Sequence, residues 1–111
     1  MSLHENIEAI ESGYEYLLAY AAQGRDSDEG SEVRDTLTSM ASAASSIAAL
    51  LANDAGGFSP VVVDDAGKAG AAIELVVAQE KISSELVDNL NASIHLRALL
   101  TDLFLLSETT D

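Results

Sequence analysis

Hydrophobic residues recur along the first half of the chain at alternating spacings of four and three residues. They stand at Leu3, Ile7, Ile10, Tyr14, Leu17 and Ala21, and again at Val33, Leu37, Met40, Ala44, Ile47 and Leu51. This rhythm places apolar side chains along one side of an α-helix. It predicts one helix over about residues 3–23, capped by Ser2, and a second that follows a cap at Ser31 and ends before Gly56. The short polar loop between them predicts an antiparallel hairpin.

The middle of the second predicted helix is built almost entirely from alanine and serine. Residues 39–52 contain no charge, aromatic ring or proline. Small side chains let two helix axes come close together, and alanine also favours the helical state. The stretch Ala66–Ile73 has a similarly small surface. We therefore expect these two stretches to face each other.

The last part of the chain predicts a third helix that starts between Ser59 and Asp65. No residue from Ala71 to Ser107 breaks a helix outright, but the apolar positions drift around it. Either the helix breaks near Asn89–Asn91, which gives a fourth helix, or it is continuous and its end needs cover from a second copy. The predicted fold is a single all-α domain over residues 1–111, an antiparallel bundle of three long helices, with that break as the alternative and dimerisation completing the core.

Composition narrows the possible partners. Nineteen Asp and Glu against five Lys and Arg give a formal net charge of −14, which repels nucleic acid and anionic membrane surfaces. The chain has no cysteine, no export signal at its start and no apolar run long enough to cross a bilayer, a pattern that favours a cytoplasmic protein. The acidic residues serve solubility, attract a basic protein, or imitate a nucleic-acid backbone.

Catalytic, cofactor and metal patterns are not evident. No Glu stands three residues before a histidine, as a carboxylate di-iron bundle requires, and Glu8, Glu11 and Glu15 all belong to one helix. The segment 26–30 lacks the glycine and the later glutamate of a calcium loop. No histidine or lysine is placed to activate a serine. We expect no enzyme activity, no cofactor and no metal.

His95 suggests one alternative. Histidine-phosphotransfer domains are helical bundles of this size with an exposed histidine on a long helix, and the resemblance would make His95 a phosphoacceptor. Those domains typically carry lysine and glycine three and four residues after the histidine, where this sequence has Ala98 and Leu99. The alternative interpretation is that His95 flanks the core or a subunit contact, with its polar edge in water.

Two groups of side chains are candidates for contact with another chain. Tyr16 and Tyr20 lie four residues apart, away from the predicted apolar side of the first helix, and form either a second packing face or a docking patch. The second group is the terminal patch of Leu96, Leu99, Leu103 and Leu106. The sequence thus predicts a small acidic protein that acts by protein–protein contact, as an adaptor, a chaperone-like protein or a regulatory subunit. A homodimer is expected and a basic partner is possible. An anionic inhibitor that mimics nucleic acid is the alternative.

Overall fold

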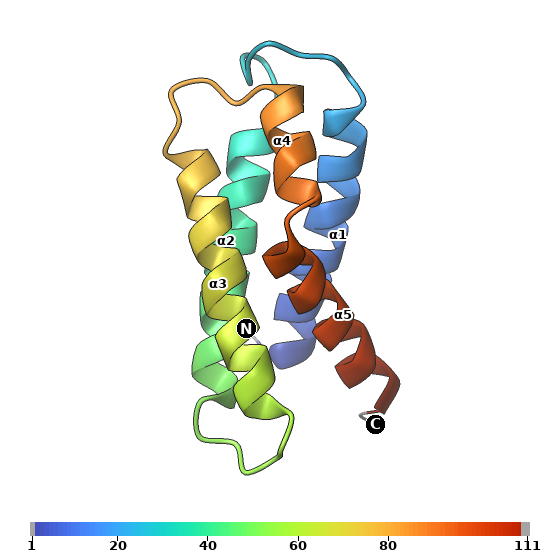
Figure 1. Ribbon diagram of the computed structural model, residues 1–111, viewed down its shortest axis with the longest axis vertical. Helices are drawn as coiled ribbons and strands as arrows, with labels where there is room; N and C mark the ends of the chain where they lie inside the picture. Colours follow the sequence, from blue (N-terminus) through green and yellow to red (C-terminus); the bar gives the residue numbers. More distant parts are fainter. Residues whose placement is uncertain (1, 110–111) are drawn as a thin grey trace.

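The computed structural model describes residues 2–109, which form five α-helices and no strand. Three helices of 19 residues come first: α1 (Leu3–Ala21), α2 (Val33–Leu51) and α3 (Ser59–Val77). Two shorter ones follow, α4 (Ser84–Asn91) and α5 (Ile94–Thr109). Figure 1 shows that successive long helices run in opposite directions, and that α4 and α5 return along the bundle one after the other. The prediction of an all-α bundle is confirmed.

The helix starts depend on local hydrogen bonds, and the sequence predicted some of them. The Ser2 hydroxyl accepts the Glu5 N–H while the Glu5 carboxylate accepts the Ser2 N–H, so the predicted cap of α1 is confirmed as a reciprocal capping box. At α2 the Ser31 hydroxyl accepts the Val33 N–H, as the predicted cap requires, and at the same time donates to the Asp28 carbonyl and closes a turn in the loop. The residue immediately before the helix is Glu32, whose side chain makes no capping bond.

The core follows the predicted apolar positions closely along α2. Val33, Leu37, Met40, Ala44 and Ile47 are all fully buried. The predicted contact between small residues is also confirmed. Ala66 and Ala69 of α3 are buried with Ala44, and a Cβ added at Gly70 would lie 3.8 Å from the Ala44 Cβ. Small side chains therefore bring α2 and α3 together, as their mutual packing requires.

The long third helix is the main error of the sequence prediction. The chain leaves the helical path after Val77 and again after Asn91, so it has five helices rather than three or four. The second break lies where the alternative placed it. The first was not predicted, and it has a tertiary cause. Ile82 is fully buried and its carbonyl accepts the Tyr20 hydroxyl, while the Ser83 hydroxyl accepts the Leu86 N–H and starts α4.

The chain is therefore folded back on itself, with overall extents of 44 × 25 × 23 Å. α5 packs mainly against α3 and more lightly against α1 and α4. No described helix is both long and apolar enough to cross a membrane.

Candidate functional site

Tyr16 and Tyr20 of α1 pack within the fold. Tyr20 is fully buried, and its hydroxyl lies 2.5 Å from the Ile82 carbonyl, to which it donates. Its ring stacks on Tyr16 with 6.4 Å between centroids, and the Arg25 guanidinium lies 5.6 Å from its centroid. Tyr16 is half-buried and its hydroxyl accepts the Glu32 N–H. Tyr20 is therefore not available as a docking residue, and the packing interpretation describes the pair.

The predicted terminal patch is mostly interior. Leu96, Leu99 and Leu103 are fully buried in the core of the single chain, and Leu106 is half-buried against it. The reason is the first helix break, after Val77: it turns the chain back along the bundle, so that α5 packs on α3 and α1 and its leucines are covered by their own chain. These three residues do not form a surface for a second molecule.

The opposite side of α5 is apolar as well, and this feature was missed. Ile94 and Leu105 are 74% and 50% exposed, and Phe104 is 52% exposed. Ile94, Ala98, Thr101 and Leu105 follow the spacing i, i+4, i+7 and i+11, so they lie along one side of the helix. We call Ile94, Ala98, Thr101, Phe104 and Leu105 the outer face of α5. The signal in the sequence was that apolar residues surround this helix on every side instead of forming one stripe.

A small groove between α1 and α5 borders the outer face. Tyr14 of α1 lines it with Arg97, Leu100, Thr101 and Phe104 of α5, and its volume is about 190 Å³. Its walls are a tyrosine ring, a phenylalanine ring and aliphatic side chains, and Arg97 is the charged group. An apolar side chain from another molecule fits such a recess without burying an unpaired polar group.

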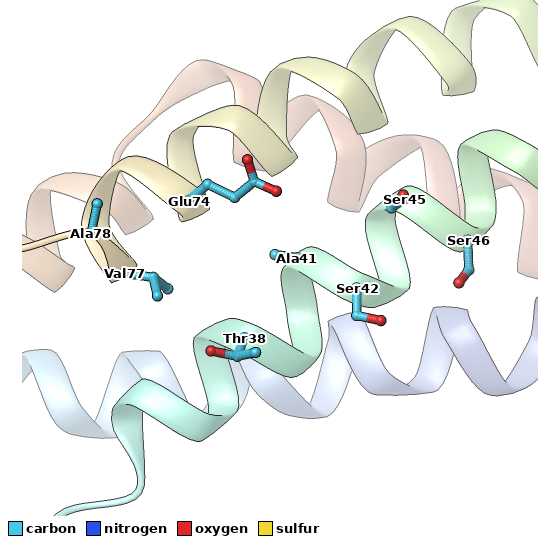
Figure 2. A pocket seen from close by; sticks show the side chains of 8 residues that line it. All are labelled: Thr38, Ala41, Ser42, Ser45, Ser46, Glu74, Val77 and Ala78. Carbon is cyan, nitrogen blue, oxygen red and sulfur yellow. The ribbon is translucent and has the colours of Figure 1, made fainter.

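A shallow groove of about 530 Å³ lies between α2 and α3. Figure 2 shows its small side chains, with the Glu74 carboxylate as the one charged group among the eight labelled residues. It continues into a neighbouring recess of about 240 Å³ lined by alanines and glycines. The small residues that bring the two helices together also leave this hollow on the outside. Ser45 of α2 and Glu74 of α3 line both recesses.

A cluster of polar side chains joins the loops at the upper end of Figure 1. We call Tyr20, Asp28, Arg34 and Ser84 the loop-end cluster. Arg34 donates to the Val77, Gln79 and Glu80 carbonyls, which satisfies the C-terminal end of α3. The Arg34 guanidinium, together with the Ile82 N–H, lowers the pKa of Asp28 below its usual value. This cluster fixes loops and does not face a cavity.

A second polar feature lies between α3 and α5. Asp102 of α5 is only 7% exposed, and its Oδ2 has no hydrogen-bond partner among the described residues. The Asp65 carboxyl of α3 lies within hydrogen-bonding reach of it. Burial raises the pKa of Asp102 to about 7, and the neighbouring Asp65 carboxyl adds to the rise. We call these two residues the carboxyl pair.

The remaining chemical candidates lie apart from one another. His95 is exposed in the first turn of α5, where its N–H donates to the Ser93 hydroxyl. Glu8, Glu11 and Glu15 form an acidic hollow with Ser12 on α1. No group of three or more His, Cys, Asp or Glu among residues 2–109 is arranged to hold a metal ion.

Comparisons of this chain with protein-family models, with curated proteins and with solved structures found no match.

Proposed function

We propose that this protein acts by non-covalent contact with another protein, and that the outer face of α5 binds a basic amphipathic helix. The observation that carries this proposal is the exposure of Ile94, Phe104 and Leu105 on a helix whose other side already fills the core. Helices that are apolar on every side are usually buried on every side. The apolar side chains of the outer face are therefore exposed, although their composition is typical of a surface that packs against another element.

The spacing of the outer face specifies the shape of the partner. Residues at i, i+4, i+7 and i+11 form a straight strip along one helix, which is the surface that a second helix covers. The groove beside it, with Tyr14 and Leu100 in its walls, gives an anchoring side chain a place to enter. The rest of the strip is flat enough for ridge-into-groove packing.

Charge specifies the rest of the partner. The chain carries a net charge of −14, and Glu11 stands one helical turn before Tyr14 on the same side of α1. A partner rich in lysine and arginine gains from this field, whereas a second copy of the chain brings 14 more negative charges. Self-association and a cytoplasmic location stay predictions. The long overhanging helix that argued for a dimer is not part of this fold.

The experiment uses a fluorescent lysine–leucine peptide of about 18 residues, five helical turns, with all leucines on one side. Anisotropy is measured at physiological salt, about 0.15 M. We expect Ile94→Ser, Phe104→Ser and Leu105→Ser each to weaken binding by about tenfold or more, since central apolar anchors dominate such contacts. Leu75→Ser is the matched control, because Leu75 is 67% exposed on α3 and should leave binding unchanged.

Two results would overturn the proposal. A scrambled peptide of the same composition that binds equally well would show that charge alone acts, which favours the anionic mimic of nucleic acid. Sedimentation that finds a dimer of the wild-type chain and a monomer of Leu105→Ser would assign the outer face to a second copy.

A further inference from the structure

The carboxyl pair of Asp65 and Asp102 is the one place in the described core where an acid lies without a counter-charge. Asp102 stands between Leu100 and Leu103, which are buried, and belongs to the side of α5 that faces α3. Its Oδ2 is buried and accepts no hydrogen bond. An ionised carboxylate in such a place costs free energy, because it has lost water and gained no donor.

The group opposite makes ionisation still less favourable. Asp65 presents a second carboxyl, so the two groups bond to each other only while at least one holds a proton. The nearest cation along α3 is Lys68, which is 2.9 Å from Asp64 and therefore already paired. Among the described residues, neither α1 nor α4 presents a charged group that acts on Asp102. No neighbour compensates the negative charge.

We propose that the carboxyl pair is a proton-controlled contact that holds the C-terminal half of α5 on α3 and releases it when both carboxyls are ionised. The N-terminal half of α5 is held differently. It follows α4, which is attached to α1 by the Asn91 side chain donating to the Leu17 carbonyl and by the Ser84 hydroxyl donating to the Tyr20 carbonyl. Release is therefore expected from about residue 101 onward, while α4 and the start of α5 stay in place.

The direction with pH follows from the raised pKa of Asp102. The docked state binds a proton that the released state loses near the ordinary value of 3.8. Docking is therefore fully favoured below about pH 3.8, weakens as the pH rises toward about 7, and is weakest above that value. The pair thus responds between about pH 3.8 and about pH 7. This inference holds whether or not the outer face of α5 binds a peptide.

The test is amide hydrogen exchange of the free protein at about pH 5.5 and about pH 8.5, corrected for intrinsic rates, with NMR resolving each helix. We expect protection in the C-terminal half of α5 to fall about tenfold or more between the two, while α2 keeps its protection. Asp102→Asn should abolish the fall, because the amide has no charge to gain. Asp88→Asn, the same change at an exposed position of α4, should leave it intact.

Asp65→Asn is the second variant, since Asp65 is half-buried and its replacement spares the interior. It should reduce the fall in protection between the two pH values, because loss of the Asp65 carboxyl removes both contributions by which Asp65 raises the pKa of Asp102. A smaller fall in this variant supports the pair. Equal protection at both pH values in the wild type, or an unchanged fall in both asparagine variants, would overturn the inference. So would a fall spread evenly over all five helices.

Discussion

The start of α4 and the C-terminal half of α5 both pack on the long helices, but polar groups meet them in opposite ways. At α4, donors and acceptors from the loop-end cluster match one another: Tyr20 donates to Ile82, and Asp28 accepts the Ile82 N–H and bonds to Arg34. At α5, the carboxyl pair brings together two acids with no donor. A satisfied network specifies one arrangement, whereas an unsatisfied group leaves a second arrangement close in free energy.

Titration sharpens this contrast. The pKa of Asp28 is lowered by Arg34 and the Ile82 N–H, so its ionised form belongs to the folded state. Burial raises the pKa of Asp102 to about 7, so its protonated form does. A rise in pH therefore stabilises the attachment at the start of α4, through Asp28, and weakens the packing of the C-terminal half of α5, through Asp102.

The largest expected effect comes from breaking the loop-end cluster. Arg34→Ala removes a guanidinium that bonds to Asp28, to the carbonyl of the last residue of α3 and to two carbonyls beyond it. We expect the free energy of unfolding to fall by about 2–3 kcal/mol, measured by urea denaturation. Arg97→Ala is the control, because that side chain stands in the exposed wall of the α1–α5 groove, and it should change stability by less than about 0.5 kcal/mol. If both variants lost the same free energy of unfolding, the loop-end cluster would contribute no more to stability than an exposed arginine does.

An intermediate effect is expected from pH alone, with two amides as reporters. Protection of the Ile82 N–H should be lost as the pH falls below about 3.8, because its acceptor Asp28 takes up a proton. Protection of the Leu103 N–H should instead be lost as the pH rises from about 3.8 toward about 7. Hydrogen exchange followed from below about pH 3.8 up to about pH 7 measures both losses, and a parallel response of the two amides would remove the contrast.

The smallest effect is expected at His95, which lies beside neither polar group. His95→Ala should leave the melting temperature within about 2 °C of the wild type, since the side chain is exposed. Treatment with acetyl phosphate followed by mass spectrometry should show no label that depends on His95. A label that disappears in His95→Ala would instead support the phosphotransfer interpretation.

The sequence predicted the parts of the fold that depend on local periodicity. The buried positions along α2 and the close contact of Ala44 with Gly70 of α3 follow from spacing and side-chain size alone. The break after Val77 does not, because it depends on Tyr20 reaching Ile82 across 62 residues of sequence. The sequence did contain a signal of this break, since the apolar positions shift around the helix between Val77 and Ile82. That shift also fits one continuous helix that packs against different neighbours along its length.

The candidate sites were harder to predict for the same reason. Leu99 and Leu103 are apolar, and only the path of the chain decides whether the chain itself or a partner covers them. Asp102 looked like a surface charge among leucines until the register of α5 against Asp65 was known. A helix that is apolar on every side indicates contact on every side, but it does not tell which side faces the core.

One close contact in the first hairpin limits where this protein can move. A Cβ at Gly13 would lie 2.5 Å from the Met40 Cγ, so the methionine rests directly on the backbone of α1. To slide by one turn, α2 would have to drive Met40 into the space of Ala9 or Leu17, which already carry side chains. The hairpin therefore acts as a fixed base, and the release proposed for the C-terminal half of α5 would leave α1 and α2 in register.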